Sequence, residues 1–332
     1  MNSLFKTGTS VSGYVHLVII YLVWGSTYLA IRICVQDGGG FPPLIMASSR
    51  GLVGSFILLI LIKSIWNQKL KLEKEHLQLL VITGLLLFMF GQGGVSVAET
   101  IVDSGFAALI IGGTPLIVAI IETVIDRQYP STLFVVSLSM GFAGIAVLNG
   151  PAIIHQDIGQ IKGVIILIIA SCSWASATVI QKRKLTGSSP ALNSAYQQCI
   201  GGCGLMAASL SLGEPLPAPT TPAWIAWGYL VIFGSIIAFT SYVYAIRSLP
   251  TKIVMTYAYV NPIIAVFLGW LILDEKITLW TLSGAVLIIL GVIGVFRDQN
   301  KHTNKHTNKH THKHTNKHTN KHTNKHTNKH TN

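Results

Sequence analysis

The chain has 332 residues, of which 50% are hydrophobic and only 11% are charged. Soluble proteins carry about a quarter charged residues, so this composition excludes an ordinary soluble protein and indicates several membrane crossings. The net charge of +12 is misleading, because eight of the 24 Lys and Arg lie after residue 300. The other 16 Lys and Arg are offset by 12 Asp and Glu, which leaves a net charge of +4. This charge gives no support for nucleic-acid binding.

The N-terminal segment 1–13 is short and polar, and no signal-peptidase cleavage pattern follows the first apolar run. We therefore expect this segment to be cytoplasmic. Ten apolar stretches of about 17–25 residues follow, each long enough to cross a hydrocarbon core of about 30 Å as a helix. They predict an all-α polytopic membrane protein with ten transmembrane helices. The stretches are Tyr14–Ile33, Phe41–Lys63, Leu79–Ala98, Ser104–Ile125, Thr132–Leu148, Ile161–Ile180, Pro190–Leu212, Ala223–Ile246, Thr251–Leu273 and Leu279–Phe296.

Lysine and arginine fall unevenly between the loops on the two sides. If the N-terminus is cytoplasmic, that side receives twelve of these residues and the outer side receives three, Arg32, Lys162 and Lys276. Cytoplasmic loops are enriched in Lys and Arg, so both termini are predicted to be cytoplasmic.

Several residues recur at a nearly constant offset. Pro115 and Pro262 are 147 positions apart, and Trp24 and Trp174 are 150 apart. We therefore predict a tandem repeat, with the first copy at 14–149 and the second at 160–296. Each copy spans the membrane five times, an odd number, so the copies are inverted relative to each other. Transporters built in this way bind substrate near the midplane, at the interface between the copies.

Each copy also has a proline inside its fourth apolar stretch. Pro262 follows Asn261 and lies roughly 16 Å into its span, counted from Thr251 at about 1.5 Å per residue. A proline cannot donate a helical hydrogen bond and disfavours helical geometry in the residue before it. Pro115, which follows Thr114, has the same position in the first copy. We predict that both prolines are hinges.

We predict one central cavity, at which aromatic and polar residues of both copies meet. Trp24 and Trp174 lie too deep in their spans for an interfacial aromatic belt, and flat rings suit amphipathic substrates. Arg50 lies about 10 Å inside its span, where it binds a carboxylate or phosphate of the substrate or caps helix ends. The predicted substrate-binding residues are Trp24, Thr27, Arg50, Thr114, Trp174, Tyr257 and Asn261.

Two acidic residues bracket the outer turn between the third and fourth stretches. Glu99 and Asp103 could titrate in proton coupling, although an exposed loop carboxylate is the favoured interpretation of each. The four cysteines have no metal-ligand partners in the sequence, so no catalytic residue, metal or cofactor is expected.

The segment 297–332 is predicted to be a disordered cytoplasmic tail. It is built from Lys-His-Thr-Asn repeats and has no apolar residue after residue 300. Its regularly spaced histidines could bind Ni(II) or Zn(II) if the tail were helical, but a plain disordered extension is favoured.

Five segments of the chain together resemble the EamA-type drug/metabolite transporters. They are Trp24-Gly-Ser-Thr-Tyr-Leu-Ala-Ile-Arg32, Pro43 with Arg50, Val97-Ala-Glu99, Gly228-Tyr-Leu-Val-Ile-Phe-Gly-Ser-Ile-Ile-Ala238 and Tyr257-Ala-Tyr-Val-Asn-Pro262. The resemblance covers about residues 14–296. It implies ten helices in two inverted EamA repeats, a central cavity, and export of amino acids, metabolites or drugs. In one departure, Gln128 stands where the second copy has the acidic Glu275 that often ends the fourth helix of each repeat.

The predicted function is a secondary transporter that exports small organic solutes by alternating access. It would lie in the bacterial inner membrane as a monomer or homodimer, with the lipid bilayer and a small-molecule substrate as its partners. No nucleotide-binding motif of the form G-x-x-x-x-G-K-[ST] is present. Two alternatives remain open: a membrane-embedded lipid-modifying enzyme, against which the lack of a His–Asp or Glu–His set in the spans argues, and a metal-responsive sensor that uses the tail.

Overall fold

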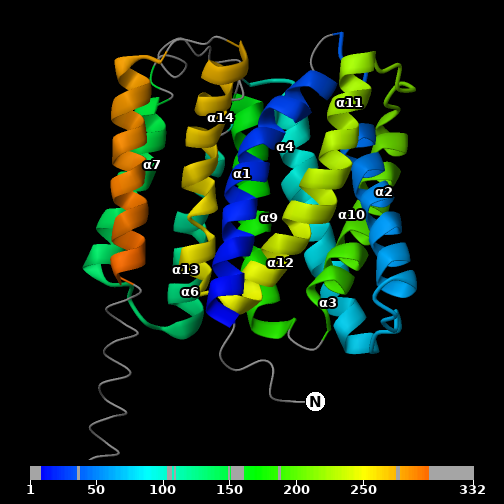
Figure 1. Cartoon of the computed structure of the whole chain (residues 1–332), viewed down its shortest axis with the longest axis horizontal. Coiled ribbons are helices and arrows are strands. Elements are labelled where there is room, and N and C mark those ends of the chain that lie inside the picture. Colours follow the sequence, from blue (N-terminus) through cyan, green and yellow to red (C-terminus); the bar gives the residue numbers. More distant parts are fainter. Residues whose placement is uncertain are drawn as a thin grey trace, which may run out of the picture.

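The computed structural model describes residues 9–35, 38–102, 107, 110–148, 150, 161–185, 188–273 and 277–298. Within these ranges the ordered elements are helices and no strand occurs, which confirms the all-α prediction (Figure 1). Asp103, Glu275, most of the N-terminal segment and nearly all of the predicted tail lie outside the described residues.

The helices of the first half run between the two ends of one bundle (Figure 1). α3, the π-helix η1 and α4 follow one another without a break and together form one continuous helical rod. The elements are α1 (Thr9–Val35), α2 (Pro43–Ser64), α3 (Lys74–Gly84), η1 (Leu85–Gln92), α4 (Gly93–Ala98), α6 (Thr114–Asp126) and α7 (Thr132–Leu148).

The second half has a corresponding rod with a π-helix, η3, between α11 and α12. The elements are α9 (Ile161–Lys184), α10 (Pro190–Leu212), α11 (Thr221–Tyr229), η3 (Leu230–Ala238), α12 (Phe239–Ser248), α13 (Thr251–Val254) and α14 (Tyr257–Leu273). A last helix, Leu279–Asp298, follows.

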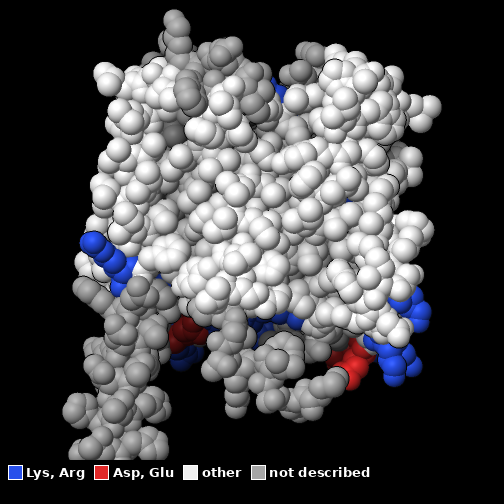
Figure 2. Space-filling view, viewed as in Figure 1, with Lys and Arg blue, Asp and Glu red and all other residues white. Residues whose placement is uncertain are grey.

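Six helical stretches of the described chain are long and apolar enough to cross a membrane, and Thr132–Val147 is a shorter apolar helix. The six are Val11–Val35, Pro43–Ser64, Lys74–Ala98, Ile161–Lys184, Thr221–Ser248 and Leu279–Asp298. Large apolar side chains such as Phe56, Val124 and Ile225 are exposed on the outside of the bundle. In Figure 2 the middle of the molecule shows almost no charge, and most visible Lys and Arg lie at its lower end. This surface fits a protein surrounded by lipid.

The two halves pack as related units. α1 contacts α14 and the rod of α11, η3 and α12, while α9 contacts α6 and the rod of α3, η1 and α4. The most extensive contact between helices joins α2 to α10. If every helix is exchanged for its counterpart in the other half, the same set of contacts results. The start of α1 at Gly13 and the end of α9 at Lys182 both lie against Leu249, so α1 and α9 run in opposite directions.

Both proline-containing stretches are interrupted before the proline. Pro115 lies in the first turn of α6, after a turn at Gly112 and Gly113. The missing N–H of Pro115 removes no helical hydrogen bond, because the N–H groups in the first turn of a helix have no acceptor within the helix. Pro262 lies inside α14, whereas the helix is interrupted earlier, at Met255 and Thr256. The helical path therefore breaks near both prolines, and their role as hinges remains a prediction.

The α13–α14 junction consists of tight turns. The N–H groups of Thr256, Ala258 and Tyr259 donate to carbonyls three residues back, at 3.0–3.2 Å. Such short stretches with i to i−3 bonding inside a longer helix often mark a site of movement.

An acidic residue of the second half holds the start of α2. The Glu214 carboxylate accepts hydrogen bonds from the N–H groups of Leu44 and Ile45, both at 3.0 Å, and from Ser209 Oγ at 2.8 Å. The first N–H groups of a helix have no partner within the helix, and the helix dipole favours an anion there. This contact ties the loop after α10 to the N-terminus of α2.

We expect Glu214→Ala to lower the free energy of unfolding by about 1–2 kcal/mol, since two N–H groups lose a charged acceptor. Thermal unfolding of the purified protein in detergent measures the change. Glu73→Ala is the matched control, because Glu73 precedes α3 without a side-chain capping bond. Equal effects of the two substitutions would show that the Glu214 contact stabilises nothing.

Candidate functional site

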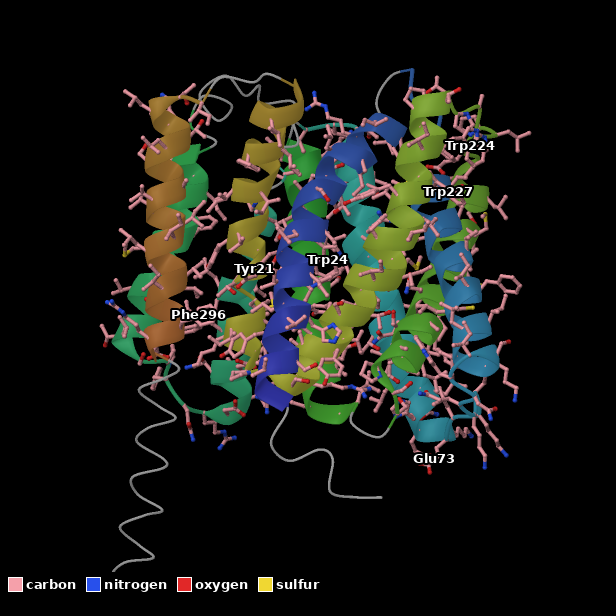
Figure 3. All side chains as sticks on the ribbon, in the orientation of Figure 1. Tyr21, Trp24, Glu73, Trp224, Trp227 and Phe296 are labelled. Atoms are coloured by element: carbon pink, nitrogen blue, oxygen red, sulfur yellow. The ribbon has the colours of Figure 1, made fainter. Side chains whose placement is uncertain are left out.

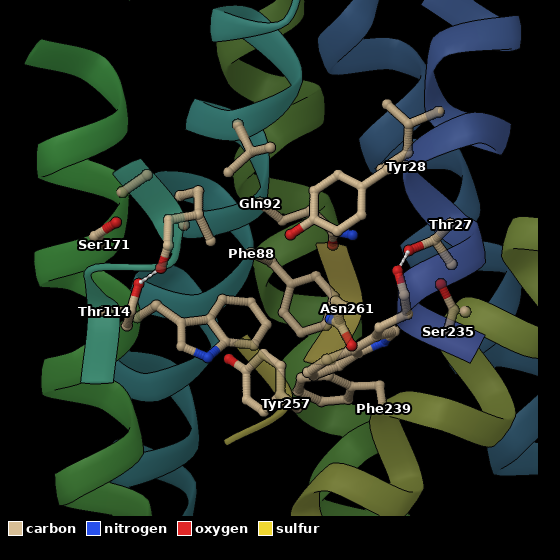
Figure 4. Close-up of a pocket in the computed structure, with 18 of the residues that line it drawn as sticks. Thr27, Tyr28, Phe88, Gln92, Thr114, Ser171, Ser235, Phe239, Tyr257 and Asn261 are labelled. Carbon is tan, nitrogen blue, oxygen red and sulfur yellow. Dashed lines mark hydrogen bonds between the residues drawn. The ribbon is translucent and has the colours of Figure 1, made fainter. Parts of the chain in front are cut away.

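A cavity of about 110 Å³ lies at the centre of the bundle (Figure 4). Its walls come from α1, α2, α4, α9, α12, α14, both π-helices and the start of α6. All seven residues predicted to bind substrate line it: Trp24, Thr27, Arg50, Thr114, Trp174, Tyr257 and Asn261. The structure thus brings them together, while their role in binding remains a prediction. The other lining residues are Tyr28, Ile31, Phe88, Gly91, Gln92, Val95, Ile111, Ala170, Ser171, Gly234, Ser235 and Phe239.

Glycines of the two π-helical rods let helices of the other repeat approach closely at the cavity wall. A Cβ on Gly91 of η1 would lie 3.1 Å from the Trp174 ring on α9. A Cβ on Gly234 of η3 would lie 3.3 Å from Thr27 Cγ2 on α1. Each contact joins the π-helix of one half to the first helix of the other half. π-helical turns occur frequently at functional sites because the extra residue re-aims the neighbouring side chains.

Four aromatic rings pack together at one side of the cavity, and three of them line it. The centroid of Trp24 lies 5.6 Å from that of Trp174, 5.2 Å from Tyr242 and 5.0 Å from Tyr257. These distances are typical of favourable ring contacts. The Tyr242 hydroxyl is hydrogen-bonded to Thr178 at 2.5 Å, which fixes the ring. Tyr242 does not line the cavity itself, and the sequence prediction did not include it.

This aromatic cluster of Trp24, Trp174, Tyr242 and Tyr257 lies deep in the bundle. Figure 3 shows Trp24 about halfway along α1, whereas Trp224 and Trp227 lie near the upper end of the molecule. Trp224 and Trp227 contact Phe41 at that end, as an interfacial belt would. An interfacial belt therefore does not explain why Trp24 lies deep in the bundle.

A second cavity, of about 470 Å³, has walls from α6, α7, α9, α13 and the end of the last helix. On α9 the central cavity includes Trp174 and the second cavity includes Lys182, eight residues or about 12 Å further along the helix. Charged side chains line the second cavity, and two ion pairs join them: Arg183 with Asp126 at 2.7 Å, and Lys252 with Asp298 at 2.6 Å. On α9, Trp174 of the aromatic cluster is the central-cavity residue nearest to this second cavity, which we call the inner cavity.

Several polar atoms at the central cavity are buried without a hydrogen-bond partner among the described residues. They are Arg50 Nε, Gln92 Oε1, Ser171 Oγ and Asn261 Oδ1. Buried polar atoms are nearly always paired, so such a group of unpaired donors and acceptors indicates a place for polar groups of a ligand or for water. Gln92 and Ser171 were missed by sequence reasoning, because single polar residues in apolar spans carry no positional signal.

Arg50 has two predicted roles, which the geometry distinguishes. Its side chain is 4% exposed and makes no hydrogen bond or ion pair to another residue of the described ranges. A helix-capping arginine would donate to backbone carbonyls. The structure thus shows no capping contact of Arg50 among the described residues, and its role in binding a ligand remains a prediction. Thr27 and Thr114, by contrast, already donate to backbone carbonyls of their own segments at 2.8 and 2.6 Å.

The favoured interpretation of Glu99 as an exposed loop carboxylate is wrong. Glu99 follows α4 directly, and both of its carboxylate oxygens are buried without a described partner. Burial raises the pKa of this carboxyl to about 8, although Arg50 and Arg32 oppose the shift. The prediction of exposure failed because hydropathy does not report how a turn packs, and here both carboxylate oxygens are enclosed. Asp103 lies outside the described residues.

Comparison with known proteins supports membrane transport. A protein from Escherichia coli K12 described as "Uncharacterized inner membrane transporter YedA" is 37% identical over 279 residues, which cover 83% of this chain and 86% of that protein. The "Uncharacterized transporter YoaV" of Bacillus subtilis is 25% identical over 83% of this chain and 94% of its own length.

A solved structure titled "Crystal structure of protein" superposes with a TM-score of 0.72 at 18% identity. It covers 87% of this chain and 99% of its own, and at this identity it supports the fold alone. The profile of the EamA-like transporter family matches residues 11–150 and 161–297. These two matches span both halves of the helical bundle, so the chain belongs to the EamA-like transporter family.

Proposed function

We propose that this protein is a secondary transporter that exports small organic solutes, namely metabolites, amino acids or drugs, across the bacterial inner membrane by alternating access. The observation that carries the proposal is the central cavity, where unpartnered polar atoms and aromatic rings from both repeats meet. A site with apolar walls and a few convergent polar groups is typical of small-molecule binding.

We further propose ten membrane crossings in two inverted five-helix repeats. Three further crossings are too short to be recognised from the length of an uninterrupted helix. α6 and the α13–α14 stretch are interrupted, and α7 is short. α10 is long enough but polar. Its buried Gln197 donates to Thr83 Oγ1 at 2.8 Å and to Gln181 Oε1 at 2.6 Å. A helix enclosed by other helices can be polar inside a membrane, because the protein supplies the hydrogen bonds.

The aromatic cluster is the proposed barrier between the cavity and the cytoplasm. Along α1, the lining residues Thr27, Tyr28 and Ile31 come after Trp24, away from the start of the helix. The start of α1 lies at the end of the bundle where most visible Lys and Arg gather, which would be cytoplasmic (Figure 2). The cavity then lies on the outer side of the cluster, as expected for a state that releases substrate outward.

Expression of the chain in a sensitive bacterial strain should raise tolerance to at least one compound in a panel of toxic amino-acid analogues and drugs. Asn261→Ala should weaken binding of that compound two- to tenfold and reduce the tolerance, because one hydrogen bond is worth about 0.5–1.5 kcal/mol.

The matched control is Asn193→Ala. Asn193 is fully buried and hydrogen-bonded to His76 at 3.0 Å, but it lies outside the cavity. This substitution should lower thermal stability and leave tolerance per folded protein unchanged. If Asn261→Ala behaves like Asn193→Ala, the cavity is not the transport site.

Arg50→Lys should weaken binding of phenylacetate more than that of phenethylamine, two probes that share one ring and differ in charge. Lysine keeps the positive charge but lacks the planar fork that pairs with a carboxylate. Calorimetric titration of the purified protein measures both affinities. An equal loss for the two probes would contradict a carboxylate-binding role for Arg50.

A further inference from the structure

Three polar side chains form a stripe on the rod of η1 and α4. Gln92, Ser96 and Glu99 are four and then three residues apart, the spacing of neighbours on one face of a helix. Gln92 Oε1, Ser96 Oγ and both Glu99 oxygens are buried without a partner among the described residues. The stripe begins in the central cavity, to which Gln92 belongs, and ends at the outer end of α4.

An unpartnered buried carboxylate is expensive when it is ionised. Glu99 has no hydrogen bond to stabilise its charge, and no cation lies within salt-bridge distance of it in the described chain. Neutralisation by a proton removes the cost, as does a cation that approaches from the cavity. The side chain therefore suits an exchange between these two species.

The described charged and titratable groups that act electrostatically on Glu99 come from two neighbouring helices. Arg50 lies on α2, which packs against α4, and Arg32 and Tyr28 lie on α1. α9 also packs against α4 and adds no charge at Glu99. With Glu99 ionised, its charge offsets that of Arg50. With Glu99 protonated, Arg50 makes the cavity electropositive, and a positively charged group at Gln92 is disfavoured.

We propose that Glu99 is the proton-binding site of the transporter, and that a proton on Glu99 and a positively charged amine in the cavity exclude each other. A proton that enters from the outer end along the stripe then displaces the amine outward. One H⁺ bound to the carboxylate replaces one ammonium group, so the charge of the site balances. This inference rests on the proposed function and adds to it an amine-bearing substrate class and the proton as coupling ion.

The first test needs no substrate. Infrared spectroscopy of the purified protein follows the C=O band of a protonated carboxylic acid as pH is raised. We expect a band that disappears near pH 8, well above the value of about 4.3 for an unperturbed Glu. The band should be absent in Glu99→Gln and retained in Glu122→Gln, a carboxyl of the inner cavity. Its persistence in Glu99→Gln, or a midpoint at the ordinary value, would overturn the proposal.

The second test uses binding of phenethylamine and phenylacetate by the purified protein. Below the midpoint, phenethylamine affinity should fall about tenfold for each pH unit, the slope of one competing proton. Phenylacetate affinity should not fall, and Glu99→Gln should abolish the slope for phenethylamine. A slope that survives in Glu99→Gln, or a phenethylamine affinity that does not change with pH, contradicts exclusion at Glu99.

The two tests also separate this proposal from the proposed function. If neither probe binds and no solute is transported, the proposed transport function is wrong. The infrared titration still decides whether Glu99 holds a proton. Should Glu99→Gln not fold, Glu99→Asp replaces it, since this variant keeps the carboxyl and must shift the midpoint of the band. An unshifted midpoint in Glu99→Asp assigns the proton elsewhere.

Discussion

The structure depends on one constraint: inside a membrane, a polar side chain must find its partner within the protein. α10 shows how the constraint is met. It packs against α2 so closely that a Cβ on Gly202 would meet Leu52 Cγ at 2.9 Å, and Ser48 donates to the Gly202 carbonyl at 3.0 Å. Its glutamines donate to neighbouring helices. The central cavity is the place where the constraint is left unmet, at Arg50, Gln92 and Asn261. A site that receives and releases a polar solute needs such unmet groups.

The repeat provides the geometry of that site. Counterpart elements meet at the centre, so α1 and α9 each place a tryptophan against the other, and each π-helix offers a glycine to the facing helix. The same symmetry puts an interrupted helix on either side of the cavity. In inverted-repeat transporters, movement of one repeat against the other opens one side of a central site as it closes the other, and this is the movement proposed for the protein.

Much of this arrangement could be predicted from the sequence. Offsets of 147 and 150 residues paired Pro115 with Pro262 and Trp24 with Trp174, and the structure brings the two tryptophans into one cavity. The interruption at Met255 and Thr256 could not be predicted, because proline chemistry points to the residues next to Pro262. The two π-helices were missed for a similar reason: an extra residue per turn depends on packing between helices and leaves apolar composition unchanged. The burial of Glu99 depends on the fold of the outer turn.

Access to the cavity from both sides is the central claim, and side-specific labelling of a single cysteine tests it directly. Ser171→Cys, in a protein whose four native cysteines are replaced, places a thiol in the cavity. A membrane-impermeant maleimide should label it from the periplasmic side of cells and from the cytoplasmic side in inverted vesicles. Ser48→Cys, fully buried between α2 and α10, should be labelled from neither side. Labelling of the cysteine at position 171 from one side alone, or from neither, would contradict alternating access through this cavity.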